Sequence, residues 1–204
     1  VIAPLNKPQS ENWIDLIPEQ KEVLSVNTGG GNIFCSYLKD AITKVLQYDM
    51  KGNKIREVVL PGLGTASGFN GKRKEKTVFY SFSSYTTPST IYKMDIASGK
   101  AEVYKKPTLQ FNSDDYESKQ VFYPSKDGTK IPMMITYKKG IKLDGNNPTL
   151  LYAYGGFSVS ITPYFSTSDI ILLENGGIYA VANLRGGGEY GETWHNQGIK
   201  TKKQ

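Results

Sequence analysis

Serine hydrolysis is the first chemistry to test in this sequence, and the residues that it requires are incomplete. His195 is the only histidine, so a self-contained Ser-His-Asp triad would need it as the general base. The nearest match to a nucleophile elbow is GFSVS at 156–160, which lacks the final glycine of G-x-S-x-G. A lone histidine beside Trp194 favours a structural role. We therefore expect no complete catalytic triad in this chain.

Metal and nucleotide chemistry have little support. Cys35 is the only cysteine, and one Cys with one distant His cannot make a zinc site, so no metal is expected. The run GGGEYG at 186–191 fits G-x-G-x-x-G after a predicted strand, as in dinucleotide-binding loops. Against this, Glu189 would place a negative charge beside a pyrophosphate, and helix-forming residues begin only near Thr193. The favoured alternative is a glycine-rich loop with unusual backbone angles, and no cofactor is expected.

The segment YGGF at 154–157 is a candidate for part of an active site, because it directly follows a run of apolar residues. Glycine pairs after a strand expose backbone at the carboxyl edge of a sheet. In serine hydrolases a loop after an early strand supplies an oxyanion-hole donor, and the phenol of Tyr154 is a suitable donor. The alternative is that Tyr154 packs in the core and the glycines make a turn. Residue types alone favour this alternative.

The elements that would position this segment follow the order strand, helix, strand, helix, which is typical of an α/β layer fold. The run at 149–154 is apolar at nearly every position, which predicts a strand covered on both faces. A short helix is predicted at 170–174, ended by Asn and Gly. A second buried strand is predicted at 177–183, and Thr193 opens a helix predicted to continue to the end of the chain.

Two further features precede this layer. The polar, acidic stretch at 111–118 predicts a linker. After it, apolar segments at 120–123 and 131–137 flank Asp127-Gly128, which is a signal for a hairpin with a tight primed turn.

The first half of the chain contains a repeat. The segment at 33–37 resembles the one at 78–82, and the segment at 45–50 resembles the one at 91–96, so the period is about 45 residues. Several short strands at this period indicate β-propeller blades, each of which buries its faces against its neighbours. The alternative is two chance hairpin pairs in a β-sandwich. Two blades cannot close a ring, which needs about four to eight.

Composition and charge limit the partners. The net charge of +6 comes from short basic runs that lie far apart in the sequence, whereas a nucleic-acid groove gathers basic residues on one face. We therefore expect no nucleic-acid partner. No apolar run approaches the ~18–20 residues that span a bilayer, so no membrane is expected. A single cysteine fits a cytoplasmic or a periplasmic location. Val1 is not a start residue and the end falls within a predicted helix, so both ends are expected to be cut.

Four segments together resemble the prolyl oligopeptidase family of serine peptidases. They are YPSKDGTKIP at 123–132, KGIKLDG at 139–145, LYAYGGF at 151–157 and ANLRGGGEYGETWH at 182–195. The resemblance covers residues 119–204 with high specificity and extends less strongly through the repeat. One departure is Ala153, which stands where Gly is common in the family.

The resemblance implies a seven-bladed β-propeller coupled to an α/β-hydrolase domain that cleaves short peptides on the carboxyl side of proline. Residues 1–110 would then be the last blades, and 111–204 would be the N-terminal part of the hydrolase domain. Tyr154 would correspond to the oxyanion-hole tyrosine, which reverses the preference from residue types, and Phe157 would line the proline pocket. The family's Ser, Asp and His would lie beyond this sequence, and His195 would not be one of them.

The sequence supports three hypotheses about function. The first is part of a proline-specific serine endopeptidase that binds short proline-containing peptides. This chain alone would then be inactive, and either a second chain completes the hydrolase domain or the sequence is incomplete. The second is a non-catalytic propeller-type binding module. The third is a fragment of a nucleotide-binding oxidoreductase.

Overall fold

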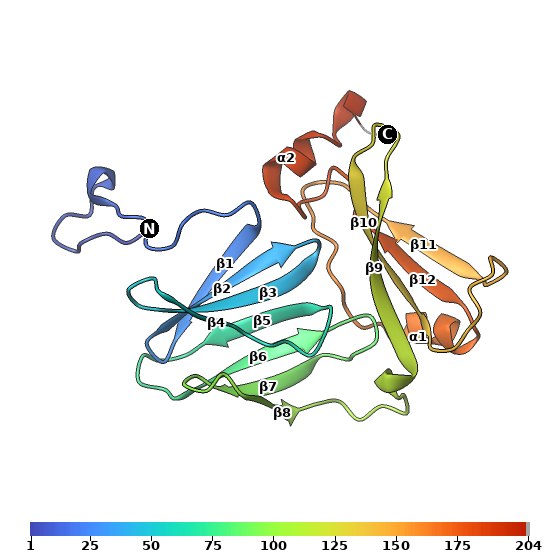
Figure 1. The fold of residues 1–204 in the computed structure, drawn as a ribbon, viewed down its shortest axis with the longest axis horizontal. Helices are drawn as coiled ribbons and strands as arrows, with labels where there is room; N and C mark the ends of the chain where they lie inside the picture. The colour runs from blue at the N-terminus through green and yellow to red at the C-terminus, as the bar shows by residue number, and fades with distance from the viewer. Residues whose placement is uncertain (203–204) are drawn as a thin grey trace.

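The computed structural model describes residues 1–202, which form three four-stranded sheets (Figure 1). The first sheet contains β1 (Val23–Gly29), β2 (Asn32–Lys39), β3 (Ile42–Asp49) and β4 (Lys54–Glu57). The second contains β5 (Thr65–Asn70), β6 (Thr77–Ser83), β7 (Thr90–Asp95) and β8 (Ala101–Lys105). The third contains β9 (Tyr116–Pro124), β10 (Lys130–Lys138), β11 (Thr149–Ala153) and β12 (Ile178–Ala182).

Short helices complete the fold. The α-helices are α1 (Thr167–Glu174) and α2 (Gly191–Asn196), and the 3-10 helices are η1 (Ser10–Asn12), η2 (Ser113–Asp115) and η3 (Lys200–Lys202). None of the helices in residues 1–202 combines the length and the apolar character needed to cross a membrane.

The first two sheets confirm the repeat as propeller blades. In both sheets the strand order is the chain order and every neighbouring pair is antiparallel. The four predicted repeat segments fall within β2, β3, β6 and β7, apart from a residue at the end of two of them. The β2–β3 turn has Asp40 and Ala41 at φ of 52° and 64°, so it is the primed type that matches strand twist.

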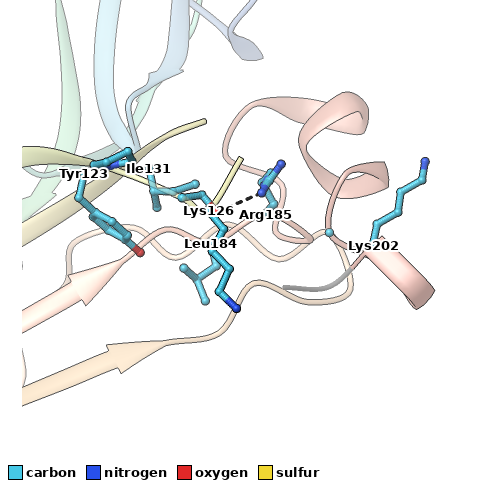
Figure 2. A pocket seen from close by; sticks show the side chains of 9 residues that line it. Tyr123, Lys126, Ile131, Leu184, Arg185 and Lys202 are labelled. Atoms are coloured by element: carbon cyan, nitrogen blue, oxygen red, sulfur yellow. Dashed lines mark hydrogen bonds between the residues drawn. The ribbon is translucent and has the colours of Figure 1, made fainter. Parts of the chain in front are cut away.

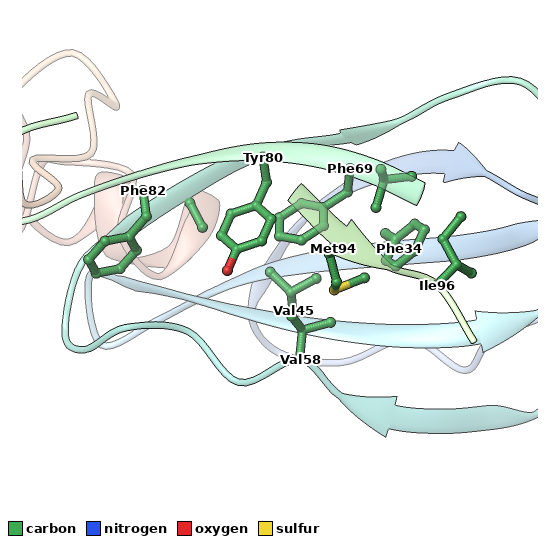
Figure 3. Close-up of a cluster of buried hydrophobic side chains, with 10 residues drawn as sticks. Phe34, Val45, Val58, Phe69, Tyr80, Phe82, Met94 and Ile96 are labelled. Atoms are coloured by element: carbon green, nitrogen blue, oxygen red, sulfur yellow. The ribbon is translucent and has the colours of Figure 1, made fainter. Parts of the chain in front are cut away.

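The main core of this region lies between the two blades (Figure 3). Phe34 of the first blade stacks on Phe69 of the second with ring centroids 5.6 Å apart, and Phe69 stacks on Tyr80 at 4.6 Å. All three side chains are at most 2% exposed. The blades therefore bury their apolar faces against each other, as a repeat architecture requires.

The third sheet has the order β11-β12-β10-β9, so the chain crosses over within it. β9, β10 and β12 pair antiparallel, whereas β11 and β12 run parallel with Ala153 opposite Ala182. Helix α1 lies against this sheet and buries Ile170 and Leu173. This mixed sheet with its helix confirms the predicted opening part of an α/β layer.

Three local predictions in this half were wrong. Every residue of β11 is exposed rather than covered, because β11 is the edge strand and pairs only with β12 within residues 1–202. The hairpin at Asp127-Gly128 is not a two-residue primed turn. Only Gly128 has positive φ, at 82°, and Ser125 and Thr129 close a three-residue loop. The last helix, α2, begins at Gly191 and ends at Asn196 instead of continuing to the end; the final residues 203–204 lie outside the described part.

The same rim of both blades faces the third sheet. The β2–β3 turn contacts β9 and the loop before α2, where Tyr190 donates its hydroxyl to Asp40 Oδ1 at 2.6 Å. Gln120 Nε2 donates to the Asp40 carbonyl at 2.5 Å. Farther along, Thr65 donates to the Pro163 carbonyl at 2.7 Å. Tyr85, from the β6–β7 turn, is buried in the core of the third sheet. Turns from both blades thus fix the propeller segment to the α/β part.

Candidate active site

The carboxyl ends of β11 and β12 bring two loops together, the segment at 154–161 and the segment at 183–191. The two strands are parallel neighbours, so the loops that follow them leave the same edge of the sheet. That edge is where α/β folds place their ligands. The N–H of Ser158 in the first loop donates to the carbonyl of Gly186 in the second at 3.1 Å.

Tyr154 follows β11 directly and carries the candidate oxyanion donor. Its side chain is 44% exposed, and its ring lies beside Gly156, where an added Cβ would come within 3.5 Å of the ring. Tyr154 is thus held at the sheet edge and is partly open to solvent. The prediction from residue types that Tyr154 packs in the core is wrong.

Phe157 stands in a backbone conformation that non-glycine residues rarely adopt. Phe157 and Ser158 have φ of 50° and 56°, in the left-handed region that costs L-residues about 1–2 kcal/mol each. The hydrogen bond from Val159 N–H to the Gly156 carbonyl closes the turn at 3.0 Å. The result is that the Phe157 ring projects outward, 87% exposed. Strain of this kind is commonly held at binding sites.

The glycine-rich segment at 186–188 is explained by close backbone packing. An added Cβ on Gly186 would collide with the carbonyl of Gly155, and one on Gly188 would collide with the carbonyl of Ser158. Gly186 also has φ of 99°. The glycines therefore let the two loops lie backbone against backbone, which is the alternative that the sequence favoured over a dinucleotide fingerprint.

His195 and Trp194 of α2 support the same two loops. Nδ1 of His195 lies 2.7 Å from the Gly186 carbonyl oxygen and 3.1 Å from the backbone nitrogen of Ser158. The indole N–H of Trp194 donates to the Leu184 carbonyl at 3.2 Å, and Trp194 is buried. This geometry gives His195 the structural role that the sequence favoured.

Sequence reasoning missed a pair of buried polar residues beneath the loops. Glu189 is 0% exposed and Asn183 is 2% exposed. Oε1 of Glu189 accepts the N–H of Ile161 at 2.9 Å and Nδ2 of Asn183 at 3.1 Å. The only sequence signal is an acidic residue inside a glycine-rich run, which argues against nucleotide binding but indicates no hydrogen-bond partner.

A second missed interaction links Arg185 to the β9–β10 loop. Its guanidinium donates to Asp127 Oδ2 at 2.5 Å, and also reaches Thr129 and Ser125. The hydrogen bond from Arg185, followed by those that Asp127 accepts from Thr129, lowers the pKa of Asp127 to about 2. Arg185 lines a cavity of about 270 Å³ together with Tyr123, Lys126, Ile131, Leu184 and Lys202 (Figure 2).

No cluster of three or more His, Cys, Asp or Glu side chains suited to a metal ion occurs within residues 1–202.

Propeller blades packed by one rim on a mixed sheet with a helix, with an exposed tyrosine after a parallel edge strand, define a two-part protein of β-propeller and α/β type. Comparison with models of protein families supports this two-part organisation. The model for the prolyl oligopeptidase N-terminal beta-propeller domain matches residues 1–107, and the model for the prolyl oligopeptidase family matches residues 163–204. The chain belongs to the prolyl oligopeptidase family.

Individual relatives support the assignment along the whole chain. The chain is 56% identical to the prolyl endopeptidase of Elizabethkingia meningoseptica and 42% identical to that of Dictyostelium discoideum, and all of it aligns with each. It covers 29% and 27% of those two proteins, so it spans less than a third of their length. A solved prolyl endopeptidase structure superposes on 99% of the chain with a TM-score of 0.89 at 45% identity, and the chain covers 30% of it.

Proposed function

We propose that this chain is part of a serine endopeptidase that hydrolyses short peptides on the carboxyl side of proline. Its similarity to prolyl endopeptidases over its full length supports this activity. The observation that carries the proposal is that Tyr154 and Phe157, which are 44% and 87% exposed, both stand in the loop that follows the carboxyl end of β11.

Tyr154 is proposed to donate a hydrogen bond from its hydroxyl to the oxyanion of the tetrahedral intermediate. An oxyanion gains negative charge only as the serine attacks, so a donor placed there stabilises the transition state more than the substrate. Phe157 is proposed to pack on the proline ring of the substrate, because a rigid apolar ring held away from the protein offers a flat surface for it.

The catalytic Ser, Asp and His are proposed to come from polypeptide outside these 204 residues, on the same chain or on a second one. The engagement of His195 with the Gly186 carbonyl supports this proposal. So does the lack of a G-x-S-x-G elbow in the sequence. We also propose a boundary between the propeller blades (1–110) and the hydrolase part (111–204), supported by β8 ending at Lys105 and the propeller match ending at residue 107.

The intact mass of the purified protein under denaturing conditions tests where the triad resides. A mass well above that of 204 residues, or a second polypeptide, is expected. A single species with the mass of these 204 residues alone would contradict the proposed peptidase activity of the sample.

The decisive test of function is hydrolysis of a Gly-Pro reporter by the full-length protein and its Tyr154→Phe variant. Loss of one oxyanion donor is expected to lower kcat by ~10²–10³ with a small change in KM. Tyr152→Phe is the matched control, because Tyr152 is similarly exposed on β11 and is given no role. Equal rates for Tyr154→Phe and wild type would overturn the role of Tyr154. Absence of hydrolysis by the wild type would favour the binding-module alternative.

A further inference from the structure

Glu189 is the one fully buried acidic side chain in the described part of the molecule, and it forms no ion pair within residues 1–202. Its carboxylate lies beneath the glycine-rich loop, where Oε2 occupies the space beside Gly187 that a Cβ would fill. Oε2 accepts no hydrogen bond in residues 1–202. Burying an acidic group without a cationic partner is costly, so its hydrogen bonds require an explanation.

Glu189 and Asn183 together satisfy both backbone groups of a single residue, Ile161. The Ile161 N–H donates to Glu189 Oε1 at 2.9 Å, and the Ile161 carbonyl accepts from Asn183 Nδ2 at 2.7 Å. The same Asn183 nitrogen lies 3.1 Å from Glu189 Oε1. The pair thus replaces, with side chains, the two hydrogen bonds that a neighbouring strand would give to Ile161.

This pair is fixed to the rigid sheet. The backbone N–H of Asn183 donates to the Pro132 carbonyl at the start of β10 at 3.0 Å, and β12 immediately before it is buried. At the other end of the loop, Ser158 is tied to Gly186 at 3.1 Å. The strained turn at Phe157 and Ser158 is therefore held by the contact of Ser158 with Gly186 and by the contacts of Ile161. The contacts of Ile161 depend on Glu189.

We propose that Glu189 is a positioning residue that holds the 154–161 loop, and through it Tyr154 and Phe157, in the geometry used for catalysis. This inference rests on the proposed function for the roles of those two side chains. Glu189 does not touch the substrate. It acts by fixing Ile161, three residues beyond Ser158, so that the turn cannot relax and move the phenol away from the oxyanion.

The test uses Glu189→Asp and Glu189→Gln in the full-length protein. Aspartate keeps the charge but withdraws the acceptor by one methylene, so it should lose the Ile161 hydrogen bond. Glutamine keeps an acceptor oxygen at the position of Oε1 without the charge. Glu192→Asp is the matched control, because Glu192 is an exposed glutamate in the following helix.

Two readouts are required. Hydrogen–deuterium exchange at the amides of 158–161 should be roughly tenfold faster in Glu189→Asp and near wild type in Glu189→Gln. The kcat per folded molecule on a Gly-Pro reporter should fall by roughly 10–100-fold in Glu189→Asp, as misplacement of a catalytic group produces, with partial or full rescue in Glu189→Gln. If Glu189 only stabilised the fold, Glu189→Asp would change the folded fraction but not kcat per folded molecule.

The outcomes separate this inference from the proposed function. Unchanged exchange and unchanged kcat in Glu189→Asp would overturn the inference alone. A large loss of kcat in Glu189→Gln with wild-type exchange at Ile161 would also overturn it, because the charge and not the position would then matter. A wild type that hydrolyses no proline reporter would overturn the proposed function, while the exchange measurement would still decide whether Glu189 holds the loop.

Discussion

Each blade pairs only strands that follow one another in the chain, whereas the third sheet places β12 between β11 and β10. In the blades, the segments that lie side by side are therefore close in sequence. The turns at one end of the blades form the rim that contacts the third sheet. In the third sheet, the crossover brings together two loops separated by α1 and β12. The candidate site residues lie in these two loops.

The two regions also differ in how they use aromatic side chains. Phe34 and Phe69 are 0% exposed between the blades, whereas Tyr154 and Phe157 are 44% and 87% exposed at the edge of the third sheet. These aromatic rings of the first region pack in the core, and those of the second are proposed to contact a ligand. Substitutions in the two regions should therefore separate stability from activity.

The largest expected effect is on stability in the blades. Phe34→Ala removes a ring buried between the two sheets and should lower the free energy of unfolding by about 3–5 kcal/mol, because it leaves a cavity. Phe79→Ala is the control, since Phe79 is 41% exposed on β6 and should cost about 1 kcal/mol. Chemical denaturation measures both. Similar losses at the two positions would contradict the interblade core.

The next effect is expected in the site loops. Gly186→Ala adds a methyl group against the Gly155 carbonyl at a φ of 99°, and should cost about 2–4 kcal/mol while lowering kcat on a proline reporter. Gly140→Ala is the control, because its φ is 82° but its surroundings are open. It should carry only the conformational cost of about 1–2 kcal/mol and leave kcat unchanged. A Gly186→Ala variant with wild-type kcat would contradict the expectation that substitutions in the site loops lower activity.

A smaller effect is expected where the regions meet. Burial, and then the Asp40 carboxylate, raise the pKa of the Tyr190 phenol, so the phenol stays protonated and donates to Asp40. A double-mutant cycle of Tyr190→Phe and Asp40→Asn should give a coupling energy of about 1–2 kcal/mol by chemical denaturation. Asparagine tolerates the positive φ at position 40. Additive effects would mean that this contact does not couple the blades to the α/β part.

The smallest effect is expected at Arg185 and Asp127, because the Asp127 side chain is 38% exposed and solvent screens the pair. The pKa of Asp127 is lowered to about 2, below the ordinary value of about 4. Its stabilisation is therefore present above about pH 4 and is lost as the pH falls toward 2. The stability difference between wild type and Asp127→Asn should shrink over that range. An unchanged difference between about pH 4 and pH 2 would contradict this role of the pair.

The sequence predicted the blades well because their pattern is local. Two pairs of similar segments at a period of about 45 residues predicted the repeat, and these segments lie in β2, β3, β6 and β7. The family resemblance pointed to Tyr154 and Phe157, whose roles stay predictions. The sequence did not predict that β11 is exposed among residues 1–202, because an apolar run does not reveal what packs against a strand. It also missed Arg185 with Asp127, since neither residue stands in a recognisable spacing with the other.

The sequence by itself determined the two-part organisation and the candidate oxyanion segment. Both depend on periodicity, turn residues and short motifs, which involve residues that are near neighbours in the chain. Only the tertiary structure decided that Glu189 and Asn183 hold Ile161, and that the glycines at 186–188 admit the backbone of the preceding loop. These contacts exist because β11 and β12 are parallel neighbours after a crossover. Which carbonyl or N–H a buried side chain then meets depends on how distant segments pack, and no local pattern records that.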